Sequence, residues 1–566
     1  MMPALTLGWE YLTGYATATD RSNRERVEWP PHPARVFMAL AAAWFETGED
    51  LREGAALQWL ESLDDPILRI PSKEQVSERS LVTVFVPVND KAGPSAAILD
   101  SAPTLTRNRQ PRTFPRVWVG EGRCFLHWTN APRADEHSEA LTRLCEKVTR
   151  IGHSSSLVRM WLGNEEGIDS EMSKWIPDEG VGDLQLRRVA SGTLAMLADL
   201  FNRADRDRHE ALTEKIVALA IQRKRVTGKG SAARKAEIAA DILNLTEERE
   251  TLNPRPPIRP TMGLWVAYRS AKSTLDPAIS SGYFDPEVLI LRQMQGPRLP
   301  IISSLSVTRA LRGAVMAHCI QPPPPWVSGH VPEGQPLRDG NGHLAMIPLP
   351  FVGSQYADGH LLGAALVFPH HVDRRERGRV LGPLLLDAEG QPRLVTLTLG
   401  SLGIWTLEKR DWSETREALT AENWTAHPRG CQTWASVTPV VFDRFPKTDR
   451  EKDRSGWVDE MCDIVSEACK RIGLPKLHAA DFGTTCWHRG SPRAIGKRRT
   501  LRGQPGSDLL LGDGFPPYPS KGSNAVRLQM HVWLQFSEPI VGPIILGAGR
   551  FHGYGLCKPW KEPKFT

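Results

Sequence analysis

Alternating and helical hydrophobic patterns divide the chain into strands and helices. Residues 5–18 alternate apolar and polar positions in a run rich in β-formers, which predicts a strand. Pro30, Pro31 and Pro33 then lead into a helix over 34–46, since proline is permitted in a first helical turn, where the N–H has no partner. The first half also predicts a helix over 51–63, strands around 81–87 and 117–128, and a helix over 136–150. This β-α-β order indicates an α+β sandwich of the ferredoxin type.

The second half repeats the same kind of pattern after a helical insertion. A charged stretch rich in alanine and leucine, residues 191–252, predicts helices, and the prolines Pro254, Pro256, Pro257 and Pro260 mark a boundary after it. Strands are then expected over 287–294, 343–352, 360–368, 434–442 and 528–536, with helices over 304–318 and 456–472. We therefore predict an α+β fold of tandem ferredoxin-like (RRM-like) modules: residues 1–252 with the helical segment 191–252, residues 261–430, and residues 431–566.

The chain carries a net charge of only +6, but its cations are clustered. Between Arg489 and Arg502 there are six basic residues and no acidic one. A second cluster lies in the helical segment and comprises Arg223, Lys224, Arg225, Lys229, Arg234 and Lys235. Such clusters are typical of surfaces that bind polyanions. A solvated face also carries like charges, and for the second cluster the pattern favours that interpretation.

The cysteines and the apolar segments of the sequence indicate the cellular compartment in which the protein is expected. The eight cysteines include no C-x-x-C pair, which argues against a zinc ribbon and a disulfide scaffold. Residues 1–15 lack the cationic start and apolar core of a signal peptide. The longest apolar helical pattern, residues 36–45, is too short to cross a bilayer. We expect a cytoplasmic protein with free thiols and no membrane contact.

A glycine-rich run near the C-terminus is the most informative local motif. Residues 547–555 contain four glycines, which let a backbone adopt positive φ and turn its N–H groups towards an anion. The spacing does not fit a dinucleotide fingerprint, and no G-K-[ST] occurs in the chain. A phosphate-binding loop is therefore one interpretation, and a turn-rich hairpin without a ligand is the other. The candidate phosphate-binding residues are Gly547, Gly549, Arg550, His552, Gly553 and Gly555.

The sixteen histidines show no metal-ligand spacing, so acid–base chemistry is the role that we consider for them. A metal-independent ribonuclease needs a group to take the 2′-hydroxyl proton, a group to protonate the leaving 5′ oxygen, and donors for the phosphorane. Histidine suits both proton transfers because its pKa lies near neutrality. The candidates are His330, in a loop after a predicted helix, and His343, which opens the next strand; a solvated loop histidine is as consistent with either position. His318, at the end of that helix, is expected to be buried. No cofactor or metal is expected.

Several motifs, in their order along the chain, resemble one known family. They are residues 10–15 (EYLTGY), 28–35 (EWPPHPAR), 328–330 (SGH), 343–345 (HLA), 348–353 (PLPFVG) and 357–363 (ADGHLLG). Together they resemble the CRISPR-associated Cas-five–Cas-six fusion proteins of type I-G (formerly I-U) systems. The terminal glycine loop is similar to the signature of repeat-associated RNA endonucleases.

The resemblance implies two functional parts. The N-terminal, Cas-five-like part would hold the 5′ handle of guide RNA, and Arg109, Arg112 and Arg116 are candidates for that contact, with an exposed loop as the alternative. The C-terminal, Cas-six-like part would cleave CRISPR repeat RNA and stay on its 3′ hairpin, leaving a 2′,3′-cyclic phosphate and a 5′-hydroxyl. In that family the base is commonly a histidine after the first helix of the first module, a position that His330 matches best.

The same resemblance implies binding partners, and two alternative functions remain beside the nuclease. The partners would be repeat RNA, mature guide RNA, the backbone and large subunits of the interference (Cascade) complex, and target DNA through that complex. Two alternatives are a non-catalytic scaffold that caps guide RNA, and a metabolic enzyme that holds a nucleotide in the glycine loop. The second is disfavoured because no βαβ unit opens at the loop and because a basic segment precedes it. The residues expected to bind the repeat stem are Arg493, Lys497, Arg498 and Arg499.

Overall fold

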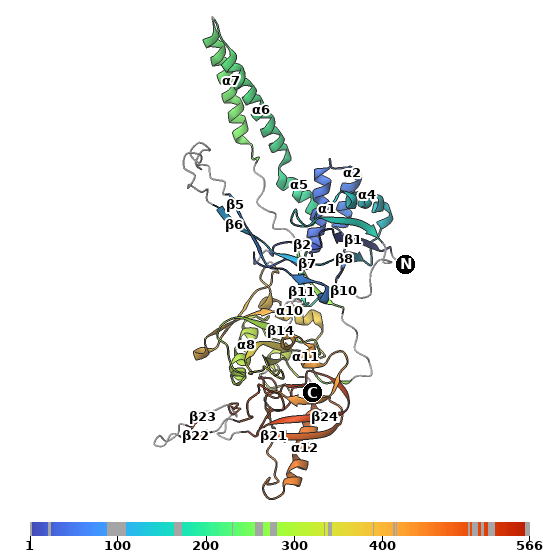
Figure 1. Ribbon diagram of the computed structural model, residues 1–566, viewed down its shortest axis with the longest axis vertical. Helices are drawn as coiled ribbons and strands as arrows, with labels where there is room; N and C mark the ends of the chain where they lie inside the picture. Colours follow the sequence, from blue (N-terminus) through green and yellow to red (C-terminus); the bar gives the residue numbers. More distant parts are fainter. Residues whose placement is uncertain are drawn as a thin grey trace. The chain divides into compact units, whose positions relative to one another are not determined.

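The computed structural model (Figure 1) divides the chain into two compact units, Met1–Ile176 with Leu186–Val266, and Pro177–Gln185 with Ala267–Thr566. The structure describes residues 3–20, 24–87, 109–120, 122–163, 172–180, 182–228, 230–254, 264–271, 280–332, 334–337, 342–388, 390–410, 414, 416–495, 498–500, 508–510, 514–518 and 527–560. Among the predicted boundary prolines, Pro256, Pro257 and Pro260 lie outside these ranges.

The first unit is built on an antiparallel sheet with the order β3-β8-β1-β9. Strand β1 (Leu5–Tyr11) lies between β8 (Arg123–Trp128) and β9 (Val158–Gly163), and β3 (Ile67–Ile70) pairs with the other edge of β8. Helices α1 (Pro33–Glu46) and α2 (Leu51–Leu60) follow β1, and α4 (Ala134–Lys147) follows β8. This βαββαβ order, with the first and third strands in the centre, is the predicted ferredoxin-like arrangement.

The predicted strand over 5–18 is in fact two strands in different sheets, β1 and β2 (Tyr15–Thr17), and so is the predicted strand over 117–128. The first part of the latter, β7 (Arg116–Trp118), pairs with β2 and β4 (Ser77–Glu78), whereas its second part is β8. The break falls at Gly120, whose φ is +58°, and Gly122, where a Cβ atom would lie 2.3 Å from Pro71. Two glycines therefore allow a sharp turn that hydrophobic alternation does not reveal.

Other elements complete the first unit. Strands β5 (Val82–Pro87) and β6 (Arg109–Phe114) form a separate two-stranded ribbon. The predicted helical insertion is confirmed as α5 (Thr193–Phe201), α6 (Arg203–Arg225) and α7 (Ser231–Thr251), of which α6 and α7 pack as a hairpin (Figure 1). The chain passes between the units at β10 (Ser173–Asp178), β11 (Leu184–Arg188) and β12 (Leu264–Ser270).

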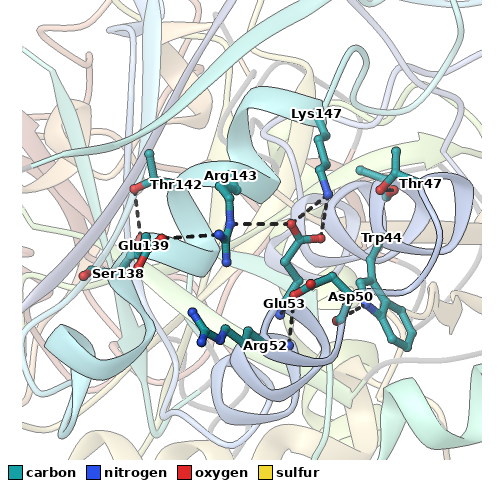
Figure 2. Close-up of polar contacts among 11 residues, drawn as sticks. Trp44, Thr47, Asp50, Arg52, Glu53, Ser138, Glu139, Thr142, Arg143 and Lys147 are labelled. Carbon is teal, nitrogen blue, oxygen red and sulfur yellow. Dashed lines mark hydrogen bonds and ion pairs between the residues drawn. The ribbon is translucent and has the colours of Figure 1, made fainter.

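A buried carboxylate fixes α2 to α4 within the first unit (Figure 2). Glu53 is only 2% exposed, and its two oxygens accept hydrogen bonds of 2.7 and 2.8 Å from Lys147 Nζ. Arg143 lies 3.9 Å from the same carboxylate. Helix α2 itself begins at Asp50, whose side chain accepts from the N–H groups of Arg52 and Glu53. Because a buried charge is costly without a partner, these contacts define how the two helices pack.

The second unit begins with a module whose sheet has the order β15-β16-β14-β18-β17. Its elements in chain order are β14 (Leu289–Gln295), α8 (Ser304–His318), β15 (Ala345–Pro350), β16 (Leu361–Val367), α10 (Arg374–Leu385), β17 (Val395–Thr398) and β18 (Ile404–Lys409). Strand β14 is central, as the first strand of a ferredoxin-like module should be, and β17 extends the edge. The segment Pro177–Gln185 belongs with this unit, since Asp178 pairs with Arg374 at 2.7 Å.

The second module of this unit has the order β25-β19-β24-β21. Its elements are β19 (Cys431–Ser436), α12 (Arg454–Arg471), β21 (Leu477–Gly483), β24 (Gln529–Val541) and β25 (Cys557–Pro559). The four strands again place the first and third in the centre. In the position of the second helix, the glycine-rich run joins β24 to β25 without helical structure.

Short elements account for the remaining described structure. The predicted strand over 434–442 is divided into β19 and β20 (Val440–Val441) because Pro439 lacks an N–H for the ladder. No helix among the described residues is long and apolar enough to cross a bilayer. The short elements are β13 (Ser280–Ser281), β20 (Val440–Val441), β22 (Arg498–Thr500), β23 (Asp508–Leu510), α9 (Pro325–Ser328), α11 (Glu422–Thr425) and 3₁₀ turns at Lys73–Gln75, Ile301–Ser303, Gly400–Leu402 and Glu417–Leu419.

Candidate functional site

The glycine-rich loop of the second module packs against the first module of the same unit. Its His552 forms a parallel backbone bridge with Met346 on the edge strand β15. The carbonyl of His552 accepts a 2.9 Å hydrogen bond from Thr308 Oγ1 on α8. The loop therefore carries its side chains to the helix and strand that precede and follow the predicted catalytic histidines.

The glycines of this loop allow close backbone packing. Gly547 and Gly555 have φ of +81° and +71°, in the left-handed region that favours glycine. A Cβ atom at Gly547 would lie 2.3 Å from the carbonyl oxygen of Val441, and one at Gly555 would lie 1.9 Å from that of Leu546. Gly553, at φ +82°, lies against Thr308, and Gly549 lies against Tyr554.

Many N–H groups of the loop are already used by the protein. Those of Ala548 and Gly555 donate to Val441 and Pro439, and that of His552 donates to Gly549 within the loop. The loop is thus a rigid, internally bonded turn, and what it presents is mainly the side chains of residues 550–552.

His343 is the histidine that contacts this loop. Its ring stacks on Phe551, with 3.6 Å between the ring centroids and 28° between the planes. Its Nδ1 lies 3.2 Å from the carbonyl oxygen of Leu344, and because a carbonyl only accepts, Nδ1 carries the proton. Nε2 therefore holds a lone pair, and it has no hydrogen-bond partner among the described residues. A neutral imidazole in this tautomer is a proton acceptor at Nε2.

The surroundings keep His343 neutral. Burial lowers its pKa to about 4, and the positive charges of Arg312 and Arg550 contribute to the lowering. At neutral pH the free site thus holds an uncharged base beside two cations. A phosphodiester bound nearby would bring negative charge and raise the pKa towards neutrality.

Arg550 is the cation that the loop presents. Its guanidinium lies 4.6 Å from the centroid of the Phe551 ring, and its Nη1 donates to the carbonyl of Gly547 at 3.1 Å. Among the described residues it has no carboxylate partner at ion-pair distance. The Arg550 side chain is partly buried, and this burial lowers its pKa. A desolvated arginine with unfilled donors is suited to a phosphate oxygen.

Arg312 on α8 fixes the turn that carries the other predicted histidine. Its Nη2 donates to the carbonyl of Ser328 at 2.6 Å. The next residue, Gly329, has φ of +75°, and a Cβ atom there would lie 2.8 Å from Cδ2 and 2.9 Å from Nε2 of His343. His330 follows and is exposed, with Nδ1 3.0 Å from the carbonyl of Ser328. Both predicted histidines therefore border Gly329, and of the two His343 stacks on the loop.

Tyrosines surround the loop. A 3.2 Å hydrogen bond joins Tyr518 Oη and His552 Nδ1. The hydroxyl of Tyr283 is buried without a hydrogen-bond partner among the described residues, and burial raises its pKa to about 12 although Arg550 acts in the opposite direction.

His318 is exposed at the end of α8, so the predicted burial of this side chain is wrong. Its imidazole reaches the carbonyl of Ala314 at 2.9 Å, as side chains at a helix C-terminus often do.

The predicted RNA-binding cations lie in different places. Arg493 is exposed, and its backbone bridges Gly514. Lys497 lies outside the described residues, while Arg498 and Arg499 are placed on β22 by their backbone alone. In the first unit, Arg109 and Arg112 are exposed on β6, and the guanidinium of Arg116 lies 4.7 Å from the centroid of the Tyr15 ring.

The opening motif 28–35 forms a buried charge cluster, which sequence reasoning did not identify. The Glu28 carboxylate, 5% exposed, accepts from Arg35 Nε at 2.5 Å and from Arg187 at 2.8 Å. Burial alone would raise its pKa, but His32 and the two arginines outweigh burial and lower it to about 2. The spacing of Glu28 and Arg35 was a possible signal; Arg187 lies 159 residues from Glu28 and gave none.

Four histidines whose pKa is lowered by burial predict acid sensitivity. Burial lowers the pKa of His32, His343, His488 and His531 to about 4, from an ordinary value of 6.5. The unfolded chain therefore binds more protons than the folded chain between pH 6.5 and 4. We expect the urea midpoint to be constant between pH 7 and 8 and to fall steadily between pH 6.5 and 4, with a loss on the order of 1 kcal/mol or more per histidine. Equal midpoints at pH 7 and 5 would contradict this expectation.

A comparison with models of protein families identifies the family of this chain. Residues 9–246 and 294–559 match the model of a family described as CRISPR-associated protein, GSU0054 family. The chain belongs to this family. The match confirms the resemblance to CRISPR-associated proteins. No curated protein matches the chain.

Two solved structures are similar to this chain over about half of its length. One is described as "An RAMP protein binding different RNA substrates", with 12% identity and a TM-score of 0.24, and the similarity covers 48% of this chain and 98% of that one. The other is described as "CRISPR associated protein Cas6", with 9% identity and a TM-score of 0.24 over 48% of this chain and 98% of its own.

Proposed function

We propose that this family member is a metal-independent endoribonuclease that cleaves CRISPR repeat RNA and remains in the interference complex. The observation that carries the proposal is the contact between His343 and Phe551. It places a neutral imidazole with a free Nε2 lone pair on a loop that also presents Arg550, a desolvated cation that has no carboxylate partner in the described part of the chain. The two ferredoxin-like modules of the second unit supply the two sides of this contact.

The geometry suits attack by the 2′-hydroxyl. In the mechanism that we propose, Nε2 of His343 takes the proton of the 2′-hydroxyl as its oxygen bonds to phosphorus. The bond from phosphorus to the 5′ oxygen breaks, and that oxygen receives a proton, for which exposed His330 is the candidate donor. The products are a 2′,3′-cyclic phosphate and a 5′-hydroxyl. Arg550 stabilises the charge that develops on the phosphorane.

In this proposal the two units of the chain contact different parts of the RNA. Arg493, Lys497, Arg498 and Arg499 are proposed to hold the repeat stem by its phosphates. Arg109 and Arg112, exposed on β6, are proposed to hold the 5′ handle of the mature guide, and Arg116 to support that surface from its place on Tyr15. Subunits of the type I-G complex and, through them, target DNA are the further partners that the proposal includes.

One observation favours a second candidate, a non-catalytic scaffold that caps guide RNA. Several N–H groups of the glycine loop are bonded within the protein, so the loop offers fewer donors to a phosphorane than its glycine content suggests. In this candidate His343 and Arg550 bind RNA without cleaving it.

The experiment that separates the two candidates uses the full chain and labelled repeat RNA in excess EDTA. Cleavage to a 2′,3′-cyclic phosphate and a 5′-hydroxyl is expected, as is resistance of an RNA with a single 2′-deoxy substitution at the cut. Tight binding without cleavage supports the scaffold. Cleavage that EDTA abolishes contradicts the metal-independent mechanism.

A further inference from the structure

The helical hairpin of α6 and α7 has charges that are segregated along its length. The part nearest the turn, residues 215–235, contains seven lysines and arginines and no acidic residue. The remaining parts, residues 203–214 and 237–251, contain nine acidic and four basic residues. One end of the hairpin is therefore strongly basic and the other is acidic. Ordinary solvated helices mix the two signs, which reduces repulsion between neighbours.

The hairpin is a defined element with an ordered base. Leu212 of α6 and Ile238 of α7 are buried. At the base, Asn202 Nδ2 donates to the carbonyl of Asn253 at 3.0 Å, and the N–H of Asn253 donates to Asp205 at 3.0 Å. Helix α6 has 23 residues and is therefore about 34 Å long.

The cations of the basic end are available to a partner. Arg223, Lys224 and Arg225 are exposed, and no ion pair holds them in the described part of the chain. Arg234 is exposed too and pairs with Glu237 on its own helix. The hairpin turn brings these two groups, from the end of α6 and the start of α7, to the same end of the element.

Helix stability does not explain this arrangement. Cations in the last turn of α6 interact favourably with the helix dipole, but Arg234 and Lys235 lie near the start of α7, where the dipole disfavours them. The first turn of α7 contains no acidic residue. The sequence alone favoured a solvated face for these cations. The structure shows that some of them lie at the start of α7, where they do not stabilise the helix, and this favours a role in binding a ligand.

We propose that the basic end of the α6–α7 hairpin binds the sugar–phosphate backbone of a nucleic-acid duplex. Residues 215–235 contain no aromatic side chain, so this surface cannot stack on the bases of a single strand. Cations without base-reading groups contact backbone phosphates and contribute affinity without sequence preference. The acidic remainder of the hairpin repels the same backbone and so confines the contact to the turn.

The test measures binding of the full chain to two duplexes of equal length that lack repeat sequence, one of DNA and one of RNA. The variant R223A/K224A/R225A/R234A/K235A is compared with the wild type over a range of salt concentrations. We expect at least tenfold weaker binding near 0.1 M salt. The log–log salt slope for DNA should also be smaller, by about 0.9 for each phosphate that the variant no longer neutralises. A weakening confined to one duplex identifies which nucleic acid the hairpin binds.

Two controls make the result specific. The variant R223K/K224R/R225K/R234K/K235R keeps every charge and should bind as the wild type does. Alanine has the highest helix propensity, so helical content by circular dichroism should be unchanged in the first variant. Unaltered affinity and salt slope for both duplexes would overturn the proposal, as would a defect seen only with vesicles of anionic lipid. Neither measurement depends on RNA cleavage, so the proposed nuclease activity and this surface can fail separately.

Discussion

Replacement of His343 by alanine should lower repeat-RNA cleavage by about 10²- to 10⁴-fold, the range for loss of a general acid–base group. RNA affinity should stay near that of the wild type, because the loop that His343 contacts is held by its own backbone hydrogen bonds and by Thr308. Single-turnover cleavage and filter binding on the same preparations separate the two effects. The matched control is His318→Ala, which removes an exposed histidine at the end of α8 and should leave cleavage unchanged.

A second variant tests the position of His343 without removing it. Gly329→Ala places a methyl group 2.8 Å from Cδ2 and 2.9 Å from Nε2 of His343, so the ring must move or its lone pair is covered. Cleavage should fall while RNA binding persists. Full activity of His343→Ala would indicate that His330 is the base instead. Full activity of both His343→Ala and His330→Ala would contradict a catalytic role for either histidine.

Replacement of Glu28 by alanine should destabilise the first unit by about 3–5 kcal/mol. The substitution leaves Arg35 and Arg187 without the carboxylate that accepts their hydrogen bonds, in a place where Glu28 itself is 5% exposed. Removing one partner of a buried pair is costly because the remaining charge stays desolvated. The measurement is the free energy of unfolding from urea titration of the full chain, followed through the transition of this unit.

The matched control lies in the same unit. Glu136 pairs with Arg133 at 2.9 Å, but both side chains are more than half exposed. Exposed pairs contribute little, so Glu136→Ala should leave the midpoint unchanged. Glu28→Gln, which keeps a hydrogen-bond acceptor, should lie between the two. A Glu28→Ala midpoint equal to that of the wild type would show that the cluster is hydrated or can rearrange.

Local pattern predicted much of the architecture because ferredoxin-like modules are made of short, separately patterned elements. The helix expected over 304–318 has those bounds as α8, and the helical insertion is confirmed. The prediction was wrong over 5–18, which forms β1 and β2 in different sheets, and over 117–128, where two glycines turn the chain between different sheets. It also missed that Pro177–Gln185 belongs with the second unit, because that membership depends on partners such as Arg374 far along the chain.

The sequence by itself determined most of the helices and several of the strands, the glycine-rich loop and the set of candidate histidines, since each is encoded by residues that are neighbours in the sequence. Only the tertiary structure decided which histidine meets the loop and what the opening motif does. His343 and Phe551 come from different modules, and Glu28 meets Arg187 only after β11 is in place. Such contacts arise from the packing of whole elements, and burial among them sets the pKa values of His343 and Glu28.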